Sequence, residues 1–116
     1  MSRPLRILFV CGRNNRRSPT AEKIYQFDRR LDVRAAGLAD TSPRRVTQAD
    51  IQWADLVLAM ERKHLKRLLG LYGDLDPRPP FESLNIPDDY TFMNKTLVRL
   101  ITEATEAALE TFGVSP

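Results

Sequence analysis

Short apolar runs alternate with amphipathic or capped segments along most of the sequence, and this alternation constrains the fold more than any other feature. Four runs have the apolar character of buried strands, at 5–10, 31–36, 56–60 and, more weakly, 81–86. The other segments have helical spacing or helix-capping residues, at 18–30, 47–54, 61–69 and 94–112. Because a helix after each strand returns the chain to the end where that strand began, the strands are expected to run parallel.

A parallel sheet is covered by helices on both faces, which matches these continuously apolar runs. We expect an α/β fold of three layers, with a four-stranded parallel sheet in the flavodoxin-like order 2-1-3-4. In that order the ligand crevice lies at the carboxyl ends beside the first strand, which Cys11 directly follows. Ser18 and Pro19 are expected to begin the next helix, as N-cap and first helical residue. Similar signals predict that Thr47 caps the second helix and Gly70 ends the third.

Length and composition exclude several classes of protein. A chain of 116 residues has room for one domain, so 1–116 is expected to form a single unit. One Cys and one His can form neither an intrachain disulfide nor a thiol zinc site. No apolar run approaches the ~20 residues of a membrane span and no export signal is visible, so we expect a cytoplasmic protein without membrane association. The net charge of +3, with arginine supplying 14 of 18 basic residues, favours an anionic partner, but no nucleic-acid motif is present.

The residues from Cys11 to Ser18 carry the predicted chemistry, in the turn between the first strand and the first helix. Backbone N–H groups in such a turn can surround an anion, and the helix N-terminus adds the positive end of its dipole. The same dipoles favour a thiolate on Cys11. Arg17 can hold two phosphoryl oxygens with its planar guanidinium, and Gly12 leaves room beside the anion. Asn14 tolerates the left-handed conformation of a tight loop, and the hydroxyl of Ser18 can donate to the thiolate.

Each of these residues also has a plain structural interpretation. A lone Cys is commonly a small apolar core residue, and Ser18 can serve as a helix cap and nothing else. The combined pattern favours a phosphate site, because the Cys at the strand end, the Arg six residues later and the Ser-Pro helix opening all agree with it.

The stretch from Ile7 to Glu22 closely resembles the signature of low-molecular-weight protein tyrosine phosphatases, in which Cys-x5-Arg-Ser-Pro-x-Ala-Glu follows the first strand. The similarity continues through 33–37 and 54–60, and residues 88–90 (Asp-Asp-Tyr) resemble the family's Asp-Pro-Tyr segment. The resemblance implies a hydrolase of phosphomonoesters that needs no metal ion or cofactor. Its substrates would be phosphotyrosine proteins or small aryl phosphates.

The resemblance also implies a role for each site residue. Cys11 would attack phosphorus to form a phosphocysteine, while Arg17 and the loop amides hold the equatorial oxygens. Asp88 would protonate the departing phenolate and then activate water, with Asp89 as the alternative acid. The remaining substrate- or phosphate-binding positions are Gly12, Arg13, Asn14, Asn15, Arg16, Ser18 and Tyr90, of which Tyr90 would stack on an aryl group.

Departures from the family pattern keep other functions open. The loop has no second Cys, Asp89 replaces a proline, and the segment between Gly37 and Thr47 is short. The alternatives are arsenate reduction coupled to an external thiol, phosphotransfer through a stable phosphocysteine, and a pseudoenzyme that binds phosphate without turnover. His64 is expected at the surface or core edge, with support of the phosphate loop as its alternative role.

Overall fold

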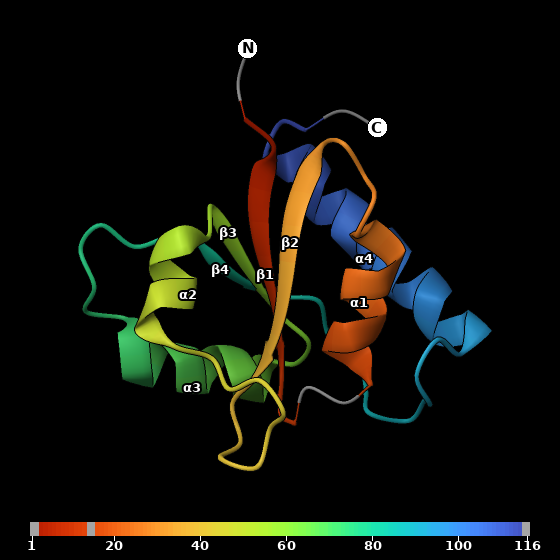
Figure 1. Cartoon of the computed structure of the whole chain (residues 1–116), viewed down its shortest axis with the longest axis horizontal. Helices are drawn as coiled ribbons and strands as arrows, with labels where there is room; N and C mark the ends of the chain where they lie inside the picture. The colour runs from red at the N-terminus through yellow and green to blue at the C-terminus, as the bar shows by residue number, and fades with distance from the viewer. Residues whose placement is uncertain (1–2, 14–15, 115–116) are drawn as a thin grey trace.

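A computed structural model, which describes residues 3–13 and 16–114, contains a four-stranded parallel sheet in the order β2-β1-β3-β4 (Figure 1). The strands are β1 (Leu5–Cys11), β2 (Leu31–Gly37), β3 (Leu56–Ala59) and β4 (Phe81–Ser83). Two helices cover one face, α1 (Arg17–Tyr25) and α4 (Lys95–Thr111). The other face is covered by α2 (Gln48–Trp53) and α3 (Arg62–Tyr72). The predicted three-layer α/β fold and its strand order are therefore confirmed.

Strand β1 lies in the interior of the sheet, paired along its length with β2 and through 7–10 with β3. Its side chains alternate between the two layers. Ile7, Phe9 and Cys11 belong to the cluster under α1 and α4, whereas Leu8 and Val10 belong to the cluster under α2 and α3. Because both faces are covered, the strand is apolar at nearly every position. Cys11 is its last residue and points toward the α1 side.

The helix starts follow the predicted signals at one position and depart from them at another. Thr47 caps α2 in a reciprocal capping box with Asp50, as predicted. The prediction that Ser18 caps α1 is wrong, because the helix begins at Arg17 and Arg16 occupies the cap position without a side-chain hydrogen bond. Ser18 lies inside the helix, and its hydroxyl oxygen contacts the Cys11 sulfur.

Two predicted helix ends are also wrong. Helix α1 ends at Tyr25, short of the expected 30. Helix α3 continues through Gly70 to Tyr72, and Gly73, whose N–H donates to the Leu69 carbonyl, occupies the cap position instead. Gly70 faces open space, so no close contact forces the chain to turn there.

Strand β4 ends earlier than predicted, at Ser83, because Asn85 adopts a left-handed backbone conformation with φ of 57°. The segment after it still follows β3: the N–H groups of Leu84 and Ile86 donate to the carbonyls of Ala59 and Met60. This extension carries the chain to Asp88 at the carboxyl end of the sheet. No helix in the part of the chain that the structure describes is both long and apolar enough to span a membrane.

Candidate active site

A cavity of about 370 Å³ lies at the carboxyl end of the sheet, beside the end of β1. Its walls come from the turn between β1 and α1, from the start of α3 and from the segment after β4. The described residues that line it are Cys11, Gly12, Arg13, Arg16, Arg17, Lys63, His64 and Asp88. The cavity thus brings together the three side chains that sequence reasoning assigned to catalysis, Cys11, Arg17 and Asp88. The predicted positions Asn14 and Asn15 lie outside the described residues.

The Cys11 sulfur is buried and lies 2.9 Å from the Ser18 hydroxyl oxygen, which is also buried. The backbone around the sulfur is held by the loop after β2. The carbonyl of Cys11 accepts from the N–H of Leu38, and the carbonyl of Gly12 accepts from the N–H of Ala39. A thiolate here would find a hydroxyl donor in place, as the sequence pattern predicted.

The Arg17 side chain is 5% exposed and is anchored at one end of its guanidinium. Its Nη1 donates to Glu61 Oε2 at 2.6 Å and to the Ile86 carbonyl at 2.7 Å. Its Nε lies 3.7 Å from Asp88 Oδ1, an ion-pair separation. Because Nη1 uses both of its N–H groups on these acceptors, Nε and Nη2 form the edge of the fork that can be presented to an anion.

Glu61 immediately precedes α3 and supplies the carboxylate that holds Arg17. Burial acts to raise the pKa of Glu61, but the hydrogen bond and positive charge of Arg17, with Lys63 and His64, lower it overall. Glu61 is therefore ionised at neutral pH and balances the buried guanidinium.

His64 is buried in the cavity wall, with 6% of its surface exposed. Its Nε2 lies 3.9 Å from Glu61 Oε2, and its Nδ1 has no hydrogen-bond partner among the described residues. Burial, followed by the charge of Arg17, lowers the pKa of His64 to about 4, so the imidazole is neutral at physiological pH. Of the two positions expected for His64, surface or core edge, the structure shows the core edge, and a supporting role for the phosphate loop stays a prediction.

The segment after β4 separates the two candidate acids. Both side chains are exposed, Asp88 by 54%, but only Asp88 is among the residues that line the cavity. Tyr90 is half-buried and packs against the hydrophobic cluster under α1 and α4, also outside the cavity lining. The proposed stacking of Tyr90 on an aryl group stays a prediction.

Sequence reasoning missed the contributions of Glu61 and Lys63 to this cavity. A usable signal was present, because Glu61 follows the third strand almost directly. In the order 2-1-3-4 the carboxyl ends of the first and third strands are adjacent, so a polar residue just after the third strand faces the same crevice.

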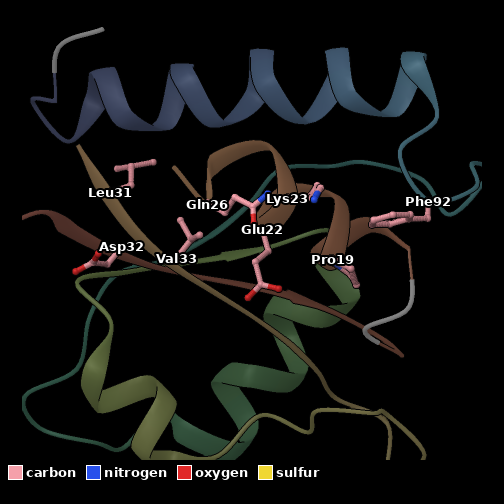
Figure 2. Close-up of a pocket in the computed structure, with 8 residues that line it drawn as sticks. All are labelled: Pro19, Glu22, Lys23, Gln26, Leu31, Asp32, Val33 and Phe92. Carbon is pink, nitrogen blue, oxygen red and sulfur yellow. The ribbon is translucent and has the colours of Figure 1, made fainter. Parts of the chain in front are cut away.

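A second hollow of about 470 Å³ lies between α1 and the edge strand β2, with Phe92 at one end (Figure 2). Its lining residues are Pro19, Glu22, Lys23, Gln26, Leu31, Asp32, Val33 and Phe92. They include no thiol or hydroxyl side chain. We therefore assign the chemistry to the smaller cavity at Cys11. Within residues 3–13 and 16–114, no group of three or more His, Cys, Asp or Glu side chains is placed to hold a metal ion.

The fold is similar to those of several solved phosphatases. SP-PTP, a low-molecular-weight protein tyrosine phosphatase from Streptococcus pyogenes, matches with a TM-score of 0.74 and 16% identity over 92% of each chain. Wzb from Vibrio vulnificus, solved with benzylphosphonate, matches with a TM-score of 0.70 and 23% identity over 92% of this chain and 98% of its own. The YwlE arginine phosphatase from Geobacillus stearothermophilus matches with a TM-score of 0.65 and 21% identity over 97% and 99%, respectively. No family model and no curated protein matches the sequence. Because these three structures are at most 23% identical in sequence to this chain, the likeness establishes the fold alone.

Proposed function

We propose that this chain is a phosphomonoester hydrolase of the low-molecular-weight protein tyrosine phosphatase type, acting on phosphotyrosine or small aryl phosphates. One observation carries the proposal: the Cys11 sulfur, with the Ser18 hydroxyl beside it, shares a cavity with an anchored Arg17 and with Asp88. A nucleophile, an anion-binding fork and a proton donor are the groups that phosphoryl transfer through a covalent intermediate requires. The likeness to tyrosine phosphatases supports the same function.

In the first step the Cys11 thiolate attacks phosphorus, and the sulfur–phosphorus bond forms as the ester bond breaks. The Nε and Nη2 edge of Arg17, together with the loop amides, stabilises the negative charge on the equatorial oxygens. The phenolate leaves with a proton from Asp88, which lies on the solvent side of the cavity.

In the second step Asp88, now a carboxylate, takes a proton from a water molecule that attacks the phosphocysteine. The sulfur–phosphorus bond breaks and inorganic phosphate forms. The thiolate that departs is stabilised by the Ser18 hydroxyl. These steps use the protein's side chains and water alone. We propose that the reaction takes place in the cytoplasm.

Hydrolysis of phosphoarginine is a second candidate, because YwlE, whose fold this chain shares, is an arginine phosphatase. The same nucleophile would attack phosphorus, and the bond that breaks would be phosphorus–nitrogen. The two candidates therefore differ in the charge of the leaving group, since the guanidinium of arginine is a cation and a phenol is neutral.

The test is turnover of para-nitrophenyl phosphate in the presence of a chelator, with Cys11→Ser as the control variant. We expect the wild-type chain to release phosphate and Cys11→Ser to be inactive while still binding vanadate, since the loop amides and Arg17 remain. Wild-type rates in Cys11→Ser would overturn the assignment of the nucleophile. Vanadate binding without turnover would indicate a pseudoenzyme, and arsenate reduction with glutathione in the absence of phosphatase activity would indicate the reductase.

A further inference from the structure

The mouth of the Cys11 cavity carries more positive charge than its interior. Arg13, Arg16 and Lys63 all line the cavity, and all three side chains are exposed. In the interior, the buried Arg17 is balanced by Glu61 at 2.6 Å, whereas Asp88, 3.7 Å from Arg17, is 54% exposed and lies toward the mouth. The uncompensated charge therefore lies at the rim, outside the place where a phosphoryl group would meet the sulfur.

Arg13 and Arg16 differ from half of the arginines of the chain. Within the described residues neither forms an ion pair, whereas acidic partners are found for Arg3, Arg17, Arg30, Arg34, Arg44, Arg45 and Arg99. Lys63 lies 3.8 Å from Glu61 Oε2, an oxygen that Arg17 already holds at the shorter distance of 2.6 Å. Three cations around one cavity mouth produce a positive potential that reaches roughly 8–10 Å into solvent at physiological salt.

From this arrangement we infer that the substrate is a phosphotyrosine segment of a protein with acidic residues beside the phosphorylated tyrosine. This inference rests on the proposed function and adds the substrate's flanking charge to it. A phosphotyrosine side chain would reach the sulfur inside the cavity, while its neighbours in the polypeptide remain at the rim. Asp, Glu or a second phosphotyrosine at those neighbouring positions would give Arg13 and Arg16 an anionic partner, and Lys63 a second one beside Glu61.

The same rim disfavours phosphoarginine. The leaving guanidinium is a cation, and it would have to sit at the mouth of the cavity among three positive side chains. Like charges at such distances repel. The rim therefore separates the two candidate substrates and selects the tyrosine ester.

The test compares three matched phosphotyrosine peptides whose flanking residues are Asp and Glu, Asn and Gln, or Lys. Exposed ion pairs are individually weak, so we expect the acidic peptide to exceed the amide peptide by roughly 3- to 30-fold in kcat/KM at low salt. The lysine peptide and a phosphoarginine peptide should be poorer than the amide peptide. Raising the salt concentration should bring the kcat/KM values of the three peptides closer to one another, because salt screens the positive charge of the rim.

The Arg13→Gln, Arg16→Gln double variant should bring the ratio of acidic to amide kcat/KM most of the way to one, because Lys63 alone remains at the rim. Arg67→Gln is the control, because Arg67 is an exposed cation of α3 outside the cavity lining and its removal should preserve the ratio. Equal turnover of acidic and amide peptides by the wild-type chain would overturn the inference while leaving phosphatase activity intact. If a second phosphate group raised the kcat/KM of a small aryl phosphate by the same factor, the assignment of the substrate to a polypeptide would be overturned.

Binding of the phosphopeptides to the Cys11→Ser variant distinguishes a failure of this inference from a failure of the proposed function. If no substrate is turned over, this variant still reports whether the cavity prefers the acidic phosphopeptide. A dissociation constant that is 3- to 30-fold lower for the acidic peptide than for the amide peptide would support the role of the rim in binding, even without catalysis. Equal dissociation constants would overturn it.

Discussion

At the scale of single residues, the contact between Cys11 and Ser18 has a consequence for the second chemical step. The hydroxyl lies 2.9 Å from the sulfur and is buried with it, so water cannot easily replace it. Hydrogen bonds to charged groups contribute about 1.5–3 kcal/mol. Ser18→Ala should therefore slow hydrolysis of the phosphocysteine by about 10- to 100-fold.

That loss is measured as a larger burst of phenol release followed by a slower steady state. The half-buried Ser83, whose hydroxyl bonds within its own turn to Asn85, provides the control variant Ser83→Ala. A Ser18→Ala variant that turns over as fast as Ser83→Ala would show that the thiolate needs no hydroxyl donor.

Asp88 and Asp89 can be separated by the substrate dependence of their variants. General acids contribute ~100- to 10,000-fold, so Asp88→Asn should lose activity in that range on phosphotyrosine. The loss should be much smaller on para-nitrophenyl phosphate, whose leaving group scarcely needs a proton. Asp89→Asn should retain most activity on both substrates, because Asp89 does not line the cavity. The reverse pattern in steady-state kinetics would reassign the acid to Asp89.

At the scale of elements, the start of α3 supports the site through Glu61. Removing its charge leaves the buried guanidinium of Arg17 without its nearest carboxylate. We expect Glu61→Gln to lower the free energy of unfolding by about 1–3 kcal/mol and to weaken phosphate binding. Glu103→Gln is the matched control, since its pair with Arg99 is exposed on α4 and should contribute less than about 0.5 kcal/mol. Equal effects in denaturant titrations would show that Glu61 does not hold Arg17 in solution.

His64, one turn into the same helix, should make stability depend on pH. The folded chain binds a proton on His64 only near pH 4, because burial and Arg17 lower its pKa, whereas the unfolded chain does so near 6.5. As the pH falls from 6.5 to 4 the unfolded state gains the extra proton, so the free energy of unfolding falls by about 3 kcal/mol. Unfolding titrations across this range should show a fall that is larger in wild type than in His64→Gln by about this amount. Parallel curves would contradict the buried, neutral assignment.

The element boundaries show where sequence reasoning stops. Gly70 looks like a helix terminator, yet α3 passes through it because the tertiary structure neither crowds nor turns the chain there. Ser18 looks like a cap, yet its side chain faces a sulfur seven positions earlier in the chain. In both cases a local signal was present and a tertiary contact, or the lack of one, decided the outcome.

At the scale of the whole molecule, the alternation of apolar runs and helices was sufficient to predict the layers and the order β2-β1-β3-β4. That order also predicts that Cys11 and Arg17 lie at the crevice, where both line the cavity. The burial of His64 and the anchoring of Arg17 by Glu61 were not predicted, because both depend on how α3 docks against the phosphate loop. Such contacts join segments that are distant in sequence and leave no local pattern.

The hydrogen bond from Arg17 to the Ile86 carbonyl joins residues 69 positions apart. During synthesis the ribosome releases the nucleophile and the guanidinium long before this carbonyl emerges. The amino-terminal half of a nascent chain therefore contains the reactive thiol without the arrangement that holds Arg17. We expect hydrolytic competence to arise only when the last strand docks, so that ribosome-bound chains paused before residue 86 are inert and chains extended through α4 are active.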